Sequence, residues 1–349
     1  MKVAITGERG FLGYHLTQYY KWVKGDQVVS LGRDYIDNIK VLKDCDLLIH
    51  CAAVHRGNNV YESNINMAKD LVNSLQDNQI NINIKYTSSV QIHNDTAYGK
   101  SKKEVSLILK DYCSKSNLLF EEYLLPNLFG VFGKPNHTSF INTFCYNVVN
   151  NLEIKYNSNE VNLCYVYDAI EVIDNKEFAF KTTNITVEEV YNLIVEFHLK
   201  YQRGVIPSIT LKFHRNLFNV YRSFASPIND RVRYSDDKGN LVKHLKSKNT
   251  ESQVFFSTIK PGITRFNHFH FNKVERFYVL SGDAKIDMRQ VGTTDVKSFT
   301  ISGDNNVVVD MPVLYTHNIT NVGITELVCV FWVDEIFDVN NSDTYYTQV

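Results

Sequence analysis

The spacing of apolar residues changes near residue 228, and this change limits the folds that the chain can adopt. Before that point, short apolar runs alternate with longer segments of helical spacing, such as residues 11–23. This alternation predicts an α/β Rossmann-type fold with a doubly wound parallel sheet. After residue 228, short apolar runs recur about every ten residues with Gly, Asn or Asp between them, which predicts an all-β sandwich or barrel. We therefore expect two domains, residues 1–228 and 229–349.

The charge balance and the cysteines exclude several classes of protein. The 349 residues include 37 Lys and Arg and 38 Asp and Glu, so the chain lacks the basic excess that non-specific nucleic-acid binding needs. No apolar run reaches the ~18–20 residues that span a bilayer, and residues 1–10 lack the apolar core of a secretory signal. The six cysteines are scattered, without a CxxC pair. We expect a cytoplasmic protein with reduced thiols, no nucleic-acid partner and no membrane insertion.

A glycine motif lies between the first predicted strand and the helix after it. Gly7, Gly10 and Gly13 follow the apolar run KVAI at every third position. Glycines at this junction permit a tight turn and let the backbone approach a pyrophosphate, which also meets the N–H groups of the helix start at Phe11 and Leu12. Ordinary helix packing can produce the same spacing, but the position after the first strand favours a dinucleotide site.

A tyrosine and a lysine form the second candidate group. Tyr98 and Lys102 are four residues apart, so on a helix they share a face, and Lys102 can lower the pKa of the Tyr98 phenol. Such a tyrosine donates or accepts a proton near neutral pH. Ser88 and Ser89 end the preceding strand, where a hydroxyl can polarise a carbonyl. The alternative is a surface helix with a chance Tyr/Lys pair, but the glycine motif and the order of the groups favour catalysis.

Together these motifs resemble the extended short-chain dehydrogenase/reductase (SDR) family, especially its nucleotide-sugar members. The resemblance covers roughly residues 1–225 and rests on TGERGFLG, IHCAAVHR, TSSVQ, YGKSK and LPNLFG. It implies that Tyr98 and Lys102 are catalytic and that Ser89, or alternatively Ser88, holds the substrate oxygen. It also implies a dinucleotide bound by residues from several loops: Gly7, Gly10, Phe11, Leu12, Gly13, Ala52, Ala53, Tyr98 and Lys102.

The resemblance also indicates the cofactor type and the substrate contacts. Arg33 follows the second predicted strand, where an NAD-selective protein more often has an acid that holds the ribose hydroxyls. An arginine suits a 2′-phosphate, so we expect NADPH, although the acid Asp34 is adjacent. In this family uracil and diphosphate usually lie beyond the PNLFG strand, which makes Asn127, Lys134 and Asn136 candidate substrate contacts. The alternative is that these three are ordinary loop residues.

The most specific motif of the chain lies in its all-β part. Five residues fit the pattern G-x5-HxH-x4-E-x6-G: Gly262, His268, His270, Glu275 and Gly282. On an extended strand His268 and His270 point to one face, so that two imidazoles can bind one metal ion. Glu275 adds an oxygen from the next strand. The pattern therefore predicts a metal site that needs one more ligand from elsewhere in the chain.

His317, in the segment PVLYTHNITN, is the candidate for that ligand. A lone strand histidine is more often structural, but the HxH pair, the glutamate and a distant histidine together predict metal binding. These residues resemble the two motifs of the cupin family, which implies a cupin barrel. Leu314 departs from the second motif, PxGxxH, which has glycine there, so we expect an altered turn before His317. The ligand set suits zinc and also accepts manganese, iron or nickel.

The order of a reductase domain and a C-terminal cupin resembles the CapF-like family of bifunctional capsule-precursor enzymes. Further matching segments are SDDKGNLVK, QVFFSTIKPGITR, YTHNI and WVDEIFDVNNSDTYY. The resemblance implies a UDP-2-acetamido-2,6-dideoxy-hexulose epimerase/reductase. In this family the cupin epimerises C3 of a UDP-activated 4-keto-6-deoxy amino sugar, and the SDR domain reduces the C4 ketone with NADPH. The product would be UDP-N-acetyl-L-fucosamine for capsule or O-antigen synthesis, and we expect a homodimer.

Two other functions stay open. One is a single-activity sugar-nucleotide reductase whose cupin, with a structural metal, serves only as a dimerisation module. The other is a catalytically inactive nucleotide-sensing protein, against which the complete Ser/Tyr/Lys set argues. The sequence does not identify the base of the epimerisation, because Tyr315, Tyr278 and Arg265 near the motifs are equally compatible with packing or phosphate contacts.

Overall fold

The computed structural model describes residues 1–349 except 34, 138, 231, 232, 237, 238, 243–245, 248–251, 337, 339 and 341, and within 229–250 it describes strand backbone only. The contacts divide the chain into two compact units, each made of two stretches. The first unit is Met1–Phe129 with Glu160–Ile185, and the second is Gly130–Asn159 with Thr186–Val349. Part of the predicted reductase domain is thus grouped with the residues after 228. A functional boundary at residue 228 stays a prediction.

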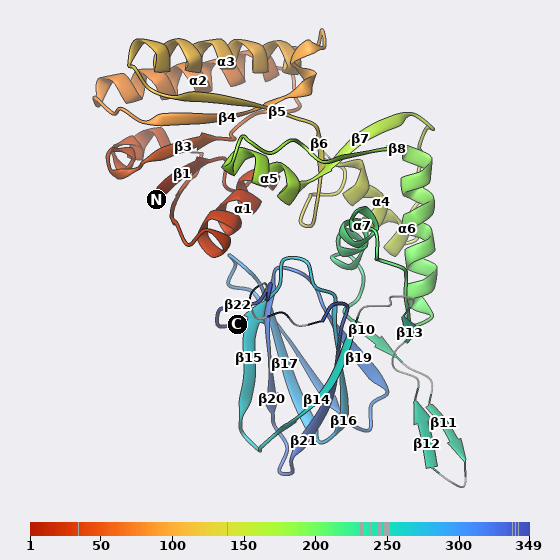
Figure 1. Ribbon diagram of the computed structural model, residues 1–349. Helices are drawn as coiled ribbons and strands as arrows, with labels where there is room; N and C mark the ends of the chain where they lie inside the picture. Colours follow the sequence, from red (N-terminus) through yellow and green to blue (C-terminus); the bar gives the residue numbers. More distant parts are fainter. Residues whose placement is uncertain are drawn as a thin grey trace. The chain divides into compact units, whose positions relative to one another are not determined.

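The first unit contains a parallel sheet with the strand order β2-β1-β3-β4-β5 (Figure 1). Its strands are β1 (Lys2–Thr6), β2 (Gln27–Leu31), β3 (Leu47–His50), β4 (Asn83–Ser89) and β5 (Phe120–Leu125). β1 and β3 are almost entirely buried, as expected for strands covered on both faces. The strands that follow β1 in the chain lie on its two opposite sides, which is the doubly wound arrangement. The predicted Rossmann-type sheet is therefore confirmed.

Helices cover this sheet and position its loops. They are α1 (Phe11–Gln18), continued by η1 (Tyr19–Val23), η2 (Tyr35–Asp44), α2 (Val60–Asp77), α3 (Ala97–Lys115) and α5 (Val166–Asp174). Residues of η2, α2 and α3 share one buried cluster with Ala4, Leu48 and Ile84, so these helices pack on the same face of the sheet. α1 contacts α5 instead. A small sheet with the order β6-β7-β8 completes the unit; its strands are Asn127–Phe129, Glu160–Tyr165 and Thr182–Thr186.

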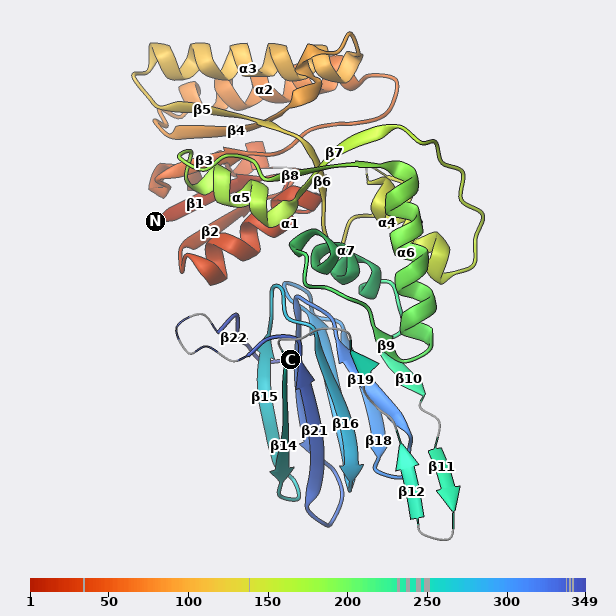
Figure 2. The ribbon, with the colours of Figure 1, turned by 45° about the vertical axis from the view of Figure 1, so that its right-hand side comes forward.

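The second unit contains two antiparallel sheets, with the orders β10-β19-β16-β21-β14 and β18-β17-β20-β15-β22 (Figure 2). The strands of the first are Ile228–Asp230, Val307–Met311, Glu275–Ser281, Leu327–Val333 and Gln253–Ile259. Those of the second are Val296–Ser302, Asp283–Gln290, Tyr315–Asn321, Thr264–Phe269 and Tyr345–Tyr346. One buried cluster contains Phe277 and Phe331 from the first sheet and Ile286 and Ile319 from the second, so the two sheets enclose a common core. The predicted all-β part is confirmed as antiparallel sheets.

Shorter elements complete the second unit. They are α4 (Phe140–Val149), α6 (Val187–Gln202), α7 (Lys212–Arg222), the hairpin β11 (Arg233–Asp236) and β12 (Gly239–Val242), and the parallel pair β9 (Val205–Ile206) and β13 (Lys246–Ser247). Buried polar contacts attach the helices to the sheets. Tyr201 of α6 donates to Asp310 Oδ2 on β19 at 2.5 Å, and Arg222 of α7 donates to the Met311 carbonyl at 2.7 Å. These contacts explain why the helices group with the strands that follow them.

Two simpler properties concern the whole of the described chain. All six cysteines are free thiols. Among the residues that the structure describes, no helix combines the length and the apolar character needed to cross a membrane.

Candidate functional site

The glycine loop between β1 and α1 has no room for a side chain at Gly7 or Gly13. Gly7 adopts a left-handed φ of +70°, and a Cβ there would lie 3.0 Å from the Ala52 backbone. A Cβ on Gly13 would lie 2.2 Å from the Gly7 carbonyl oxygen, which accepts a hydrogen bond from the Gly10 N–H at 2.8 Å. The loop therefore packs back on itself and leaves the start of α1 at Phe11 and Leu12 without a side-chain cap. This is the geometry that a pyrophosphate-binding turn requires.

The end of β3 is held against this loop by Thr6, the last residue of β1. Its buried Oγ1 accepts from the N–H groups of Cys51 and Ala52 at 3.1 and 3.2 Å. Ala52 and Ala53 thus lie at the carboxyl ends of β1 and β3, where the doubly wound order reverses and open α/β sheets bind their ligands. Thr6 is the first residue of the TGERGFLG motif, but the sequence alone did not predict this role for it.

Tyr98 and Lys102 lie in the first turns of α3, close to the end of β4. Thr96 caps this helix by accepting from the Gly99 N–H at 3.0 Å. The Nζ of buried Lys102 donates to the Thr87 carbonyl at 2.8 Å and lies 5.8 Å from the centroid of the Tyr98 ring. The structure therefore brings the two predicted catalytic residues together and attaches them to the strand that carries the two serines.

The pKa values in this group follow burial. Burial lowers the pKa of Lys102 to about 8, and it raises the pKa of the Tyr98 phenol above its ordinary value. The expectation that Lys102 lowers the Tyr98 pKa was wrong for this arrangement, because the ammonium group donates to the Thr87 carbonyl and burial governs the phenol. A phenol with a raised pKa remains protonated at neutral pH, which suits a proton donor.

The two serine candidates differ in their surroundings. The Ser89 Oγ is partly exposed and accepts from the Gln91 N–H at 3.2 Å, which caps the short helix η3 (Val90–His93). The Ser88 Oγ is buried and has no hydrogen-bond partner among the described residues. Both lie within the strand end that Lys102 contacts, and the choice between them stays open.

Two further residues near Tyr98 were not expected from the sequence. The His55 ring lies 4.9 Å from the Tyr98 ring, centroid to centroid. Asn64 of α2 holds the loop after β3: its side chain accepts from the Val54 N–H at 2.7 Å and donates to the Ser101 Oγ at 2.9 Å. Ser101 Oγ in turn donates to the Tyr98 carbonyl at 2.8 Å. No local motif marks Asn64, because its role depends on how α2 and α3 pack.

The remaining candidates of this site are more exposed. Arg33 follows β2 beside β1, exposed and without an ion pair among the described residues, while Asp34 lies outside the described residues. Asn127 is exposed at the start of β6 in the first unit. Lys134 and Asn136 belong to the second unit, where Lys134 is exposed and the Asn136 N–H donates to Thr143 Oγ1 at 2.9 Å. Their contacts with cofactor or substrate stay predictions.

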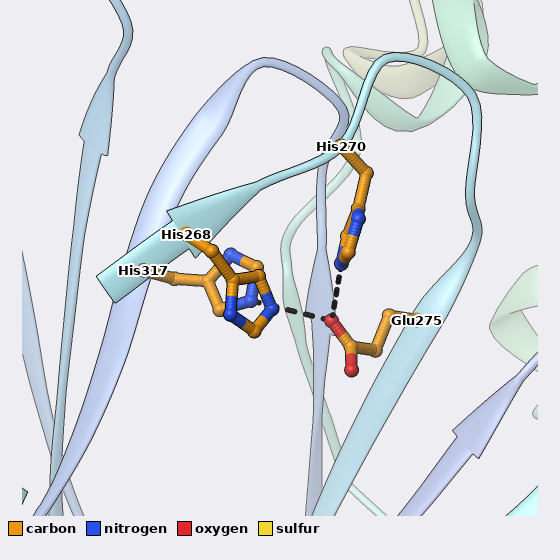
Figure 3. Close-up of side chains that lie close together, drawn as sticks. All are labelled: His268, His270, Glu275 and His317. Atoms are coloured by element: carbon orange, nitrogen blue, oxygen red, sulfur yellow. Dashed lines mark hydrogen bonds and ion pairs between the residues drawn. The ribbon is translucent and has the colours of Figure 1, made fainter. Parts of the chain in front are cut away.

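The predicted metal ligands converge in the second unit (Figure 3). One ligand atom from each of His268, His270, Glu275 and His317 lies within 4.8 Å of all the others, and all four side chains are buried. His268 lies on β15 and is paired with His317 of β20, His270 follows the end of β15, and Glu275 begins β16. A bulge in β15 sets this register, with Phe266 and Asn267 in the left-handed region at φ +80° and +68°.

The hydrogen bonds of the imidazoles show why this cluster fits a cation. His270 Nδ1 lies 2.6 Å from the Asp343 carbonyl and His317 Nδ1 lies 3.0 Å from the Tyr315 carbonyl. Because carbonyls only accept, each Nδ1 carries the hydrogen. In a neutral ring the Nε2 atom then has a free lone pair. Both Nε2 atoms lie 3.2 Å from the same oxygen of Glu275. A protonated ring donates to this oxygen, whereas two neutral rings would face it with lone pairs. A cation satisfies these converging acceptors.

The pKa shifts of Glu275 and its neighbouring histidines fit a carboxylate that is stabilised by nearby positive charge. Burial alone would raise the pKa of Glu275, but hydrogen bonds and charge from His270 and His317 hold it below its ordinary range. Burial, together with the neighbouring histidines, lowers the pKa of His268 to about 3, so this ring is neutral and available as a ligand. The pKa of His270 lies above its ordinary value because the Glu275 contact outweighs burial.

Leu314 occupies the position at which an altered turn was expected. It is fully buried and adopts the left-handed φ of +59°, the region that favours glycine. Its N–H donates to the His270 carbonyl and its carbonyl accepts from the Val291 N–H, at 2.8 and 2.9 Å. A left-handed turn therefore forms with leucine at this position. The sequence did not identify Asp343 either, because no motif connects it with the histidines.

Comparisons with known families agree with this geometry. The NAD dependent epimerase/dehydratase family matches residues 3–193, and the polysaccharide biosynthesis C-terminal domain matches residues 234–345. The first match includes the glycine loop, Tyr98 and Lys102, and the second includes all four residues of the histidine and glutamate cluster.

Similar proteins with both parts are known. The UDP-2-acetamido-2,6-beta-L-arabino-hexul-4-ose reductase of Pseudomonas aeruginosa is 30% identical over 371 positions, covering 100% of this chain and 99% of the relative. The crystal structure of the capsular polysaccharide assembling protein CapF from Staphylococcus aureus is 31% identical with a TM-score of 0.61, covering 100% of both chains. A Bacillus cereus UDP-glucuronic acid 4-epimerase, 14% identical with a TM-score of 0.50, covers 57% of this chain and 83% of its own, and shows the fold alone. The predicted CapF-like resemblance is confirmed, and the chain belongs to the NAD dependent epimerase/dehydratase family.

Proposed function

We propose that this protein is a bifunctional nucleotide-sugar enzyme that epimerises C3 of a UDP-activated 4-keto-6-deoxy amino sugar and then reduces its C4 ketone with NADPH. The observation that carries the proposal is the presence in one chain of two separate sets of reactive groups. The glycine loop with Tyr98 and Lys102 lies in the first unit, and the converging ligands around Glu275 lie in the second.

The reduction half uses the groups at the carboxyl ends of β1, β3 and β4. NADPH supplies the hydride for C4. Tyr98, whose raised pKa keeps it protonated, donates a proton to the developing C4 alkoxide. Ser89, with Ser88 as the alternative, holds the C4 oxygen, and the cationic form of Lys102 binds the nicotinamide ribose. Arg33 pairs with the 2′-phosphate that distinguishes NADPH from NADH.

The epimerisation half uses residues 229–349 of the second unit, which we propose form a cupin barrel. Its two antiparallel sheets enclose a common core, and the cluster draws its ligands from both sheets, which supports this assignment. His268, His270, Glu275 and His317 would hold a divalent metal, for which zinc is our first choice and manganese, iron or nickel the alternatives. A divalent cation held by these residues would supply positive charge that stabilises an enolate formed by loss of the C3 proton. The proton-transferring base is not assigned.

The substrate and the setting follow from the resemblance. The name of the Pseudomonas relative supports a 4-keto hexose nucleotide as substrate, and the name of the Staphylococcus protein, a capsular polysaccharide assembling protein, supports a role in capsule synthesis. We propose UDP-N-acetyl-L-fucosamine as the eventual product, with Asn127, Lys134 and Asn136 as substrate contacts. A cytoplasmic homodimer completes the proposal.

A second candidate function is favoured by one observation. The four metal ligands are at most 7% exposed, from 1% at His317 to 7% at His268, which suits a structural metal closed to substrate. The protein would then be a single-activity reductase, and its cupin, residues 229–349, would serve only as a dimerisation module. Metal removal would in that case leave the turnover of an authentic 4-keto substrate unchanged.

One assay separates these functions. Purified protein is mixed in deuterated water with NADPH and freshly prepared 4-keto-6-deoxy UDP-amino sugar, and the products are identified by NMR. The proposal expects oxidation of NADPH and deuterium at C3 of the product, and it expects metal-free protein to lose only the C3 exchange. Reduction without any C3 exchange identifies the single-activity reductase. Absence of NADPH oxidation supports a nucleotide sensor instead.

A further inference from the structure

The segment Ser342–Val349 lies along the strand that carries the HxH histidines. Its strand β22 pairs antiparallel with β15, with Tyr346 opposite His268 and Tyr345 opposite Phe269 (Figure 2). The pairing continues beyond β22, because the Thr347 N–H donates to the Asn267 carbonyl at 3.0 Å. The Thr347 carbonyl also accepts from Oγ1 of Thr316, the neighbour of His317, at 2.7 Å. The segment is thus attached to both strands that provide histidines.

Asp343 makes the contacts that reach the ligands themselves. Its carbonyl accepts the Nδ1–H of His270 at 2.6 Å. Its carboxylate accepts three successive backbone N–H groups: Phe271 at 3.0 Å, Asn272 at 2.9 Å and Lys273 at 3.3 Å. These residues form the connection between His270 and Glu275. One side chain therefore fixes the loop that sets the spacing of two ligands, and the main chain of the same residue fixes the ring of one of them.

The backbone of Asp343 supports a specific role. It adopts φ +41°, in the left-handed region that few non-glycine residues enter and that aspartate enters more readily than most. Residues in such conformations persist only where surrounding contacts hold them, and here those contacts are the four hydrogen bonds to His270 and the loop. The orientation of the His270 ring matters for metal binding, because a hydrogen bond to one ring nitrogen decides which nitrogen offers its lone pair to the metal.

We propose that Asp343 is a positioning residue for the metal centre: it aims His270 Nε2 at the cation and holds the loop to Glu275 at the spacing that binding needs. This rests on the proposed metal-binding function. Replacement of groups that orient metal-binding histidines typically weakens affinity by about 10–100-fold. The segment Ser342–Val349 is accordingly part of the metal site, although it contributes no ligand.

The test measures the affinity of the full chain for Zn²⁺ in competition with a chromophoric chelator, and the absorption spectrum of the Co²⁺-loaded protein. Asp343→Ala removes the carboxylate, and Asp343→Asn removes its charge and one acceptor with little change in shape. Both keep the main-chain carbonyl. Asp338→Asn is the matched control, because Asp338 is exposed and bonds only to a local N–H among the described residues. NADPH binding, assigned to the first unit, should be the same in all variants.

The proposal expects Asp343→Ala and Asp343→Asn to bind Zn²⁺ about 10–100-fold more weakly and to change the Co²⁺ spectrum, with Asp338→Asn unchanged. Affinity within threefold of the unmodified protein and an unchanged spectrum would overturn it while leaving the metal site intact. Failure of Asp343→Asn to fold, seen by circular dichroism of the metal-free protein, would also overturn it, since Asp343 would then serve the whole fold. If the unmodified protein binds neither ion, both the proposed metal function and this inference are wrong.

Discussion

The groups around Tyr98 and those around Glu275 satisfy their polar atoms in opposite ways. In the first unit Lys102 donates to the Thr87 carbonyl and the Thr6 hydroxyl accepts from Ala52, although the buried Ser88 Oγ has no partner among the described residues. In the second unit the Nε2 atoms of His270 and His317 converge on one carboxylate oxygen, and a proton or a cation between these groups is needed to satisfy them. We therefore expect the first site to keep its arrangement without its cofactor, and the proposed metal to stabilise the second. Each of the following variants changes one of these two sites.

The largest effect is expected from Tyr98→Phe. The substitution keeps the ring and removes the proton, so NADPH oxidation with the 4-keto substrate should fall by about 10²–10⁴-fold. NADPH affinity and C3 deuterium exchange should be unchanged, because neither needs the phenol. Residual reduction above a tenth of the unmodified rate would show that another group donates the proton.

The second variant removes two ligands from the other site. Because a two-ligand remnant holds a divalent ion poorly, His268→Ala with His270→Ala should weaken Zn²⁺ binding by more than about 100-fold. It should also stop the exchange of the C3 proton with deuterated water, while slow reduction of the unepimerised ketone continues.

The exposed His93→Ala serves as its control, and the fold and oligomer size of the double variant must be checked before its activity is interpreted. C3 exchange that survives in a folded, metal-free variant would place the epimerisation away from the metal. Exchange by an isolated fragment of residues 1–228 would place it outside the predicted cupin domain.

The pH dependence of the reduction tests the first site in the unmodified enzyme. Burial lowers the pKa of Lys102 to about 8, so in the folded protein this side chain is cationic below that pH and neutral above it. Since kcat/KM reports the ionisation of the free enzyme, kcat/KM for reduction should fall about tenfold per pH unit above pH 8. The Arg33→Ala variant should show the same decrease of kcat/KM above pH 8. A profile that is flat from about pH 7 to 9.5 would show that the charge of Lys102 is not required.

The smallest effect is expected from Arg33→Ala, on the preference for NADPH over NADH. Arg33 is exposed, and an exposed ion pair is worth about 1 kcal/mol, so Arg33→Ala should reduce the preference for NADPH over NADH by about fivefold. The ratio of kcat/KM for the two cofactors measures this. Equal values of kcat/KM in the unmodified enzyme would refute the assignment of Arg33.

The sequence identifies those parts of both sites that depend on local spacing. Gly7, Gly10 and Gly13 mark a turn that forms between adjacent elements, and the HxH pair needs only an extended strand. Even His317, far away in the chain, was identified because its own segment carries a second motif.

Other parts depend on packing that spacing does not record. Asn64 and Asp343 act through hydrogen bonds between separate elements, so no pattern of residue types predicts their roles. The direction of the Tyr98 pKa was missed for a related reason, since the helical spacing from Lys102 shows a shared face but not how deeply that face is buried.

The bulge in β15 restricts how the length of this strand can vary in evolution. Phe266, before the extra residue, packs against Phe277 and Phe331 in the core, and His268, after it, enters the ligand cluster. Side chains alternate between the two faces of a strand. The extra residue at Asn267 therefore lets Phe266 reach the core and His268 reach the ligand cluster. A homologue that lost one residue here would have to expose the phenylalanine or withdraw the histidine. Insertions and deletions should therefore be rare between Phe266 and His268 in any relative that keeps the histidine and glutamate cluster.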